Sequence, residues 1–550
     1  MAAIVAILGY VNREPRADNP GVKPHWVLIG SVVLICSTFS LPILLNLSTS
    51  NLLHYSAFGY DDAAHIQMYR ADISVEGYVS KVDKTDQPDL NIDSPVTSYP
   101  QGLHFNLSLF GRSIFDLTNK TLDDVRLLIG IYRIGMILIY AALLILLAEI
   151  IAQSVAYLRQ KQEKLGLVTQ LGMSATLFII FNTLIFPQIA FAGQSFLTTV
   201  AALCGTLLGL IIYHKTTDRL VRYIAFGSAS LFAVAAAYTW ILTVIVALTA
   251  LVAAAWGNKV VLDRSSRVFT SNWQWWFIGA ALVLSLPQVL ILLFDTHTGV
   301  NSLTNDGGIA SPDHGRYLVL ILGVLLTMLL AGIRKKTAKD SKRLFDIGIV
   351  LTSPLVLVLF FYAVQTVLTG QLSYYYTKST YLGYIILLGA IGVALTYLLS
   401  KVEIFVGLVK TLYLTVVVFG VLAMYLSVGR GFLVYAKGTN TNVQKPLTTE
   451  AGHLIDSGVR PRNIISYTGR SYEEDMFFNL VTDMLDQYRP ENRHTIAILA
   501  QQKRYEVFKQ FIGDYSRRDE RTYILVSEQT QNEMRKALPA DGNYEVIVIK

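Results

Sequence analysis

The sequence predicts an α-helical, multi-pass membrane protein with about 11 transmembrane helices and a small α/β domain at its C-terminal end. Of its 550 residues, 53% are hydrophobic and 15% are charged, whereas soluble domains carry roughly 25% charged residues. Apolar stretches recur from residue 26 to residue 428, many of them long enough to cross about 30 Å of hydrocarbon at 1.5 Å per residue. The remaining C-terminal residues are polar and alternate between strand and helix patterns, with strands expected at 463–467, 495–500, 522–527 and 544–549.

Most apolar stretches have the length of one span each. The stretch 221–256 is too long for one helix, and we expect it to divide at Tyr238-Thr239-Trp240, because amphipathic aromatic rings favour the membrane interface. The other expected spans are 26–46, 128–150, 168–186, 195–213, 274–294, 317–333, 344–363, 381–400 and 404–428.

The distribution of Lys and Arg between the loops predicts the orientation. The proposed inner loops carry nineteen basic residues, and the short outer loops carry two, Arg316 and Lys378. This asymmetry follows the positive-inside rule. We therefore expect a plasma-membrane protein with a cytoplasmic N-terminus and, after an odd number of spans, an extracytoplasmic C-terminal domain.

Two polar regions lie outside the membrane in this topology. Residues 1–436 form the expected transmembrane module, whose outer loop 47–126 contains two surface helices, one beginning at Asp61 and one after Gly102. Residues 437–550 form the expected α/β domain, which lacks a glycine-rich phosphate loop and so predicts no nucleotide site.

The net charge and the cysteine content argue against a nucleic-acid-binding protein and against a disulfide-rich or thiolate-metal protein. The net charge of +7 is explained by the loop asymmetry and does not indicate nucleic-acid binding. Cys36 and Cys204 both lie in apolar runs, so we expect neither a disulfide framework nor a thiolate metal site.

The first outer loop holds the candidate catalytic residues, Asp61 and Asp62. Acidic residues at this position also stabilise a helix N-terminus. The alternative is that one carboxylate is a general base while the other orients it or binds a metal ion. His65 lies four residues after Asp61, on the same helix face, where it is either an ordinary surface histidine or a hydrogen-bond donor to substrate.

Two short motifs in this loop carry a family resemblance. Gly59-Tyr60-Asp61-Asp62 and the later Tyr99-Pro100-Gln101-Gly102-Leu103-His104 resemble the membrane glycosyltransferases of the GT-C superfamily, in the style of bacterial cell-envelope arabinofuranosyl- and mannosyltransferases. Gln101 departs from the family's more usual second proline. The resemblance implies a GT-C-like fold, a polyprenyl-phosphate sugar donor and an acidic general base, either Asp61 or Asp62. It also implies that Tyr99 and His104 contact substrate.

An enzyme that transfers a sugar outside the membrane needs a donor held by its lipid tail, because sugar nucleotides are made in the cytoplasm. The phosphate leaving group then needs cations near the outer surface. Lys378, Arg316 and Arg133 are the candidates. Snorkelling or interfacial anchoring is the alternative explanation for each.

The remaining predicted substrate contacts come from residues near these cations. Tyr375 and Tyr376 precede Lys378 and offer aromatic faces for a sugar or an isoprenoid chain, although interfacial packing also explains them, and His314 precedes Arg316. The sequence identifies no certain cofactor. Binding of a divalent cation (Mg²⁺, Mn²⁺ or Ca²⁺) by Asp61 and Asp62 remains an alternative role for these carboxylates.

The predicted function is transfer of a hexose or pentose, with inversion, from a polyprenyl phosphate to a glycan, lipid or protein acceptor at the outer membrane face, as part of cell-envelope biogenesis. Two alternatives remain. A transporter or flippase of lipid-linked saccharides would need polar groups along a path through the bilayer, and an envelope-glycan polymerase or ligase would use a lipid-diphosphate donor.

Overall fold

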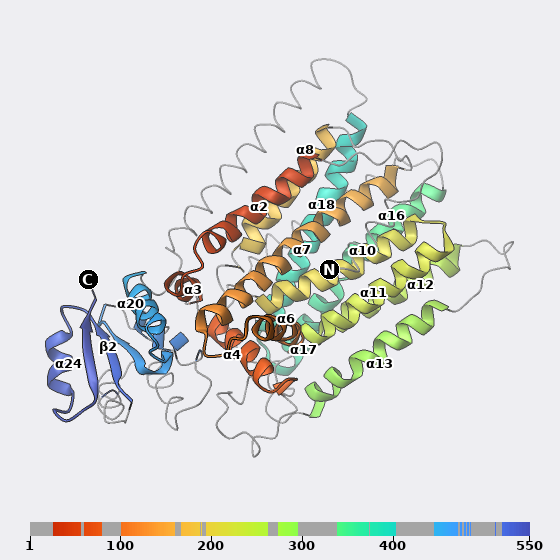
Figure 1. Cartoon of the computed structure of the whole chain (residues 1–550). Coiled ribbons are helices and arrows are strands. Elements are labelled where there is room, and N and C mark those ends of the chain that lie inside the picture. The colour runs from red at the N-terminus through yellow and green to blue at the C-terminus, as the bar shows by residue number, and fades with distance from the viewer. Residues whose placement is uncertain are drawn as a thin grey trace. The chain divides into compact units, whose positions relative to one another are not determined.

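The computed structural model (Figure 1) describes the greater part of the chain. The described residues are 26–56, 60–79, 101–159, 167–186, 189, 194–261, 273–294, 338–372, 374–402, 445–470, 474–475, 478–479, 481–482, 485, 512 and 520–549. Within these residues, six helices are long and apolar enough to cross a membrane, or seven if a bent helix pair is one span. The predicted fold class is therefore confirmed. The expected total of 11 spans stays a prediction, because 317–333 and 404–428 lie outside the described residues.

The chain divides into two compact units, and each is described by itself. Unit 1 comprises 1–37, 138–187 and 195–430, and unit 2 comprises 38–137, 188–194 and 431–550. Two helices contribute to both units, α2 (Trp26–Leu44) and α7 (Val125–Arg159).

Unit 1 is a helical bundle. Its helices are α8 (Leu167–Ile180), which continues as the π-helix Phe181–Ile185, then α10 (Gln194–Lys215), α11 (Arg219–Thr239), α12 (Thr243–Val261), α13 (Trp273–Phe294), α16 (Ala338–Thr352), α17 (Leu355–Thr369) and α18 (Tyr374–Val402). Helix α11 packs against α12 and α13, and α18 packs against α8, α16 and α17.

Two helix breaks in unit 1 have local causes. The expected division of 221–256 is confirmed: α11 ends at Thr239, and Trp240 has an extended backbone. The expected single span 344–363 is instead two helices, α16 and α17, which meet at an angle of 41°. Pro354 stands at this junction, where its ring and missing N–H interrupt helical hydrogen bonding.

Helices α10 and α11 approach closely at Gly209. A Cβ atom added there would lie 2.8 Å from the carbonyl oxygen of Ala225 and 2.9 Å from Cβ of Ala229. These distances are too short for any side chain. The glycine therefore sets the separation of the two helices.

Buried polar groups also join three helices of unit 1. The Tyr157 hydroxyl of α7 donates to Oδ2 of Asp346 in α16 at 2.9 Å. Nδ1 of His214 in α10 lies 3.7 Å from the same carboxylate oxygen. Asp346 is only 4% exposed, so its desolvation is offset by these partners.

Unit 2 contains three helices of the segment 47–126, which the sequence predicts to be an outer loop. They are α3 (Thr49–Ser56), α4 (Tyr60–Ser74) and α6 (Gly102–Thr118). The expected helices beginning at Asp61 and after Gly102 correspond to α4 and α6. Helix α3 was not predicted.

The C-terminal part of unit 2 is an α/β fold. Helix α20 (Lys445–Asp456) and a 3₁₀ turn (Pro461–Asn463) precede a parallel sheet in the order β1 (Ile464–Tyr467), β2 (Thr522–Val526), β3 (Tyr544–Val548), with α24 (Gln531–Ala537) between the last two strands. In the register, Ile465 lies beside Ile524, which lies beside Val546. The strands predicted at 463–467, 522–527 and 544–549 are present, whereas the strand predicted at 495–500 lies outside the described residues.

The close approach at Gly209 predicts a loss of stability when it is filled. We expect Gly209→Val to lower the free energy of unfolding by about 1–3 kcal/mol, the usual cost of overpacking, measured as a lower thermal midpoint in detergent. Gly279→Val in α13 is the matched control, because no atom lies within 4 Å of its added Cβ. Equal midpoints for the two variants would contradict this account of the packing.

Candidate functional site

Asp61 and Asp62 lie in the first turn of α4. Carboxylates there interact favourably with the positive end of the helix, which explains why the helix begins at this point in the sequence. Their side chains are outside the described residues, so the structure places their backbone and not their carboxylates. His65 follows one turn later on the same helix.

His65 and His104 form a buried pair. Nδ1 of His65 lies 2.9 Å from Nε2 of His104, and the two rings are stacked with centroids 4.9 Å apart. His65 is 7% exposed and His104 is fully buried. Burial lowers the pKa of His104 to about 3, so this ring is neutral at physiological pH. One nitrogen of the pair therefore donates a hydrogen and the other accepts it.

The histidines meet because α4 packs against α6 along its length. Gly111 makes this possible, since an added Cβ there would collide with the Tyr69 hydroxyl. The Tyr69 ring also lies 5.5 Å from the ring of Tyr132 in α7. At the end of α4, an ion pair of 2.8 Å joins Glu76 to Arg112 of α6. The spacing of α4, α6 and α7 is thus set by direct side-chain contacts.

Arg133 of α7 lies in the same unit and is 7% exposed. Its Nη2 donates to Oγ of Ser56 at 3.1 Å, and its guanidinium lies 5.5 Å from the centroid of the Tyr132 ring. Ser56 in turn donates to the carbonyl oxygen of Leu52 at 2.8 Å. The serine hydroxyl is therefore oriented with its lone pairs toward the arginine.

Two buried charged residues of α4 were not predicted from the sequence. Arg70 is 4% exposed, and its Nη2 lies 3.6 Å from Oδ1 of Asp123. The sequence carried no signal that distinguishes Arg70, because the segment 47–126 contains six basic residues and the positive-inside rule applies to short loops. Arg70 adds a second cation to the unit that holds Arg133.

Asp72 is the second of these residues, and it is 1% exposed. Its Oδ1 accepts from the backbone N–H of Val79 at 3.3 Å, while its Oδ2 has no hydrogen-bond partner within the described ranges. Burial raises the pKa of Asp72 to about 8, despite the opposing effect of the Val79 hydrogen bond. Asp72 therefore holds a proton at neutral pH. Polar burial of this kind is unusual outside functional sites.

Three predicted residues lie together at the start of α18 in unit 1. The Tyr375 ring is nearly parallel to those of Phe361 and Trp240, with centroids 5.9 Å and 6.3 Å away. Tyr376 is buried, with its ring centroid 6.2 Å from that of Tyr362, and Lys378 is half-buried one turn further on. The tyrosines are thus part of an aromatic cluster that joins α17 and α18.

The other predicted residues cannot be placed. Tyr99, His314 and Arg316 lie outside the described residues. Where side chains are described, no group of three His, Cys, Asp or Glu residues is arranged to hold a metal ion. The structure thus brings His65 and His104 together and places Arg133 in the same unit, and it places Tyr375, Tyr376 and Lys378 in the other unit.

Helices α4, α6 and α7 combine groups suited to transfer chemistry. Carboxylates in the first turn of α4 can accept a proton, a neutral histidine pair can donate or accept hydrogen bonds, and a buried guanidinium can hold an anion. We call the set Asp61, Asp62, His65, His104 and Arg133 the α4–α6 site.

Comparison with known proteins finds similarity only at the level of solved structures. No family model matches the sequence, and no curated protein matches it. The crystal structure of ArnT from Cupriavidus metallidurans bound to undecaprenyl phosphate is similar with a TM-score of 0.49 and 11% identity, covering 94% of each chain. The apo crystal structure of the same protein gives a TM-score of 0.42 and 13% identity, covering 92% of this chain and 95% of ArnT. Likeness at this level assigns no substrate and no residue role, so the function is argued from this chain's own residues.

The raised pKa of Asp72 predicts how stability depends on pH. The ordinary pKa of the carboxyl is 3.8, so between about pH 4 and pH 8 the folded chain keeps a proton that the unfolded chain has released. Asp72 therefore makes stability fall as the pH rises through this window. We expect Asp72→Asn to remove this fall, seen as a smaller decrease in thermal midpoint between pH 5 and pH 8. Asp116→Asn, a substitution at an exposed site on α6, should leave the pH dependence of the thermal midpoint as it is in the wild type. If Asp72→Asn also leaves this pH dependence unchanged, the assignment of the raised pKa to Asp72 is contradicted.

Proposed function

We propose that this chain is a GT-C-type membrane glycosyltransferase that moves a sugar from a polyprenyl-phosphate donor to an acceptor at the outer face of the membrane, with inversion. The observation that carries the proposal is the position of Asp61 and Asp62, one turn before a buried His65–His104 pair. A carboxylate base beside fixed hydrogen-bonding groups is what deprotonation of an acceptor hydroxyl requires.

The proposed reaction is a single displacement at the anomeric carbon. Asp61 or Asp62 takes the proton from the acceptor hydroxyl as its oxygen bonds to that carbon. The bond from the anomeric carbon to the donor phosphate breaks, and its electrons leave with the polyprenyl phosphate. Attack from the side opposite the leaving group inverts the configuration, and no covalent intermediate with the protein is needed.

The leaving phosphate gains negative charge and needs a positioned cation. Arg133 suits this role, because its guanidinium is buried and its contacts with Ser56 and Tyr132 fix its orientation. A planar guanidinium can bind two phosphate oxygens at once. We assign Lys378 and Arg316 the same role as further phosphate contacts.

The substrate contacts complete the proposal. We assign His65 and His104 to hydrogen bonding with the acceptor or the sugar. We also assign Tyr99, His314, Tyr375 and Tyr376 to substrate binding. The sugar is a hexose or pentose, and the acceptor is a glycan, lipid or protein. If Asp61 and Asp62 hold a divalent cation, a chelator will reduce activity and Mg²⁺, Mn²⁺ or Ca²⁺ will restore it.

The carboxylates provide the first test of the function. We expect that Asp61→Asn or Asp62→Asn will lower the rate of polyprenyl-phosphate release by about 100-fold or more, since a general base contributes about 10²–10⁴-fold. The assay uses the full chain in nanodiscs with radiolabelled polyprenyl-phosphate sugars and a crude envelope acceptor.

Asp116→Asn is the control for this assay, because it makes the same substitution at an exposed site on α6. Wild-type rates in both Asp61→Asn and Asp62→Asn would rule out the proposed base. Movement of intact lipid-linked sugar across liposomes, without release of polyprenyl phosphate, would indicate a flippase instead.

Arg133 provides a separate test of phosphate binding. We expect Arg133→Lys to reduce kcat/KM for the donor about 10-fold to 100-fold, the loss of one charge-assisted hydrogen bond, because an ammonium group cannot keep the planar contact. Arg126→Lys is the matched control, since exposed Arg126 donates to the carbonyl oxygen of Leu47 near the start of the same helix. If Arg133→Lys equals wild type in donor kinetics, Arg133 does not bind the phosphate.

A further inference from the structure

The C-terminal domain is in direct contact with the first outer loop. Helix α20, the first helix of that domain, packs against α3. Leu447 and Ala451 of α20 are fully buried. On the other side of the contact, seven of the eight residues of α3 are buried. Two segments about 400 residues apart in the sequence thus form one interface within unit 2.

Gly452 brings the two helices into backbone contact. A Cβ atom added there would lie 2.7 Å from both the backbone nitrogen and Cα of Ser50. Such distances are not relieved by rotating a side chain, because the atoms that would be met belong to the backbone. Any larger residue at position 452 therefore has to push α3 away from α20.

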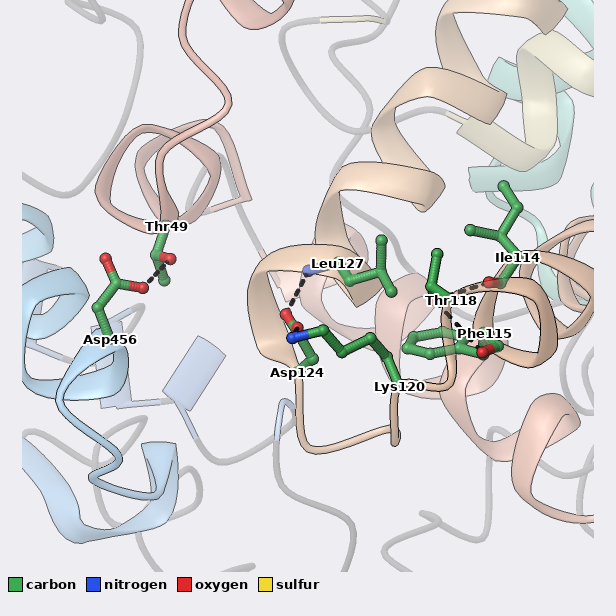
Figure 2. A network of polar contacts seen from close by, with 8 residues as sticks. All are labelled: Thr49, Ile114, Phe115, Thr118, Lys120, Asp124, Leu127 and Asp456. Carbon is green, nitrogen blue, oxygen red and sulfur yellow. Dashed lines mark hydrogen bonds and ion pairs between the residues drawn. The ribbon is translucent and has the colours of Figure 1, made fainter.

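Polar contacts fix the same interface. Oγ1 of Thr49 donates to Oδ1 of Asp456 at 2.5 Å, as Figure 2 shows. Oγ of Ser50 donates to the carbonyl oxygen of Thr449 at 3.3 Å. Thr49 is the first residue of α3 and Asp456 is the last of α20, so these bonds set the position of α3 along its axis. We call the contacts of Gly452, Asp456 and Thr449 with α3 the α20 clasp.

The opposite end of α3 contacts Arg133 of the α4–α6 site. Ser56, its last residue, accepts the hydrogen bond from Arg133. Helix α4, with Asp61 and Asp62 in its first turn, begins at Tyr60. An eight-residue helix is about 12 Å long, and α3 is short enough that a displacement of its first turn is expected to reach its last turn. A shift at Thr49 and Ser50 is therefore transmitted to Ser56.

We propose that the α20 clasp positions the catalytic machinery: Gly452 and Asp456 are positioning residues that act through α3 on Arg133 and on the start of α4. The C-terminal domain is thus a working part of the transferase. This inference rests on the proposed function, because it concerns the same reaction.

The experiment compares Gly452→Val with His453→Val in the full chain, reconstituted in nanodiscs. Both variants place valine in α20, but His453 is exposed. Hydrogen exchange of residues 49–56 and of β1–β3 is measured together with kcat and the KM for donor. We expect Gly452→Val to speed exchange in α3, leave exchange in the sheet unchanged, and lower kcat by about 10-fold or more, since misplacement by about 1 Å costs about 10²-fold. His453→Val should match wild type in every measurement.

A double-mutant cycle tests the polar part of the clasp. Thr49→Val removes the donor and Asp456→Ala removes the acceptor of the hydrogen bond between α3 and α20. We therefore expect each variant to lower kcat and the double variant to lower it no further than the larger single effect. Additive losses would mean that the two residues act separately and would overturn their pairing as a positioning contact.

The outcomes separate the inference from the function on which it rests. If wild type transfers sugar and Gly452→Val loosens α3 without changing kcat, the inference is wrong and the proposed function stands. If wild type releases no polyprenyl phosphate from any donor, the proposed function falls and the inference falls with it.

Discussion

The packing of α4 against α6 is the contact on which the candidate site depends. Tyr69 meets α6 where Gly111 has no side chain, and His65, one turn earlier on α4, meets His104, two turns earlier on α6. Because a helix turn repeats about every four residues, fixing the tyrosine also fixes the histidine and the acidic first turn of α4. The positions of His65 and His104 relative to each other thus follow from one close helix contact.

The site concentrates polar groups where burial makes them costly. Arg133, Arg70 and Asp72 are all nearly inaccessible, and a folded chain keeps such groups only when their contacts or their use offset desolvation. Asp72 meets this cost by remaining protonated. Arg133 contacts the hydroxyl of Ser56 and the ring of Tyr132, and these contacts contribute to offsetting the desolvation of its guanidinium. The packing of the surrounding helices has to hold such buried polar groups in position.

Much of this arrangement could be predicted from the sequence, and the misses have physical reasons. Span length and the aromatic turn at Trp240 were sufficient to divide 221–256, and the acidic turn at Asp61 predicted α4. Helices α3 and α20 escaped prediction because short helices are marginal alone and these two are buried against each other. The bend at Pro354 was not predicted, because 344–363 was assigned as one span from its high hydropathy and the proline within it was not treated as a helix break. The pairing of His65 with His104, 39 residues apart, and the burial of Asp72 are tertiary facts that periodicity cannot show.

The sidedness of the outer loop tests the account most directly. A single cysteine at position 120, in the turn after α6, and another at position 219, at the start of α11, are introduced separately into a chain with Cys36 and Cys204 replaced by alanine. A membrane-impermeant maleimide is then applied to intact cells. The account predicts that Lys120→Cys reacts at once and that Arg219→Cys reacts only after permeabilisation. The reverse pattern would place the α4–α6 site in the cytoplasm and contradict transfer at the outer face.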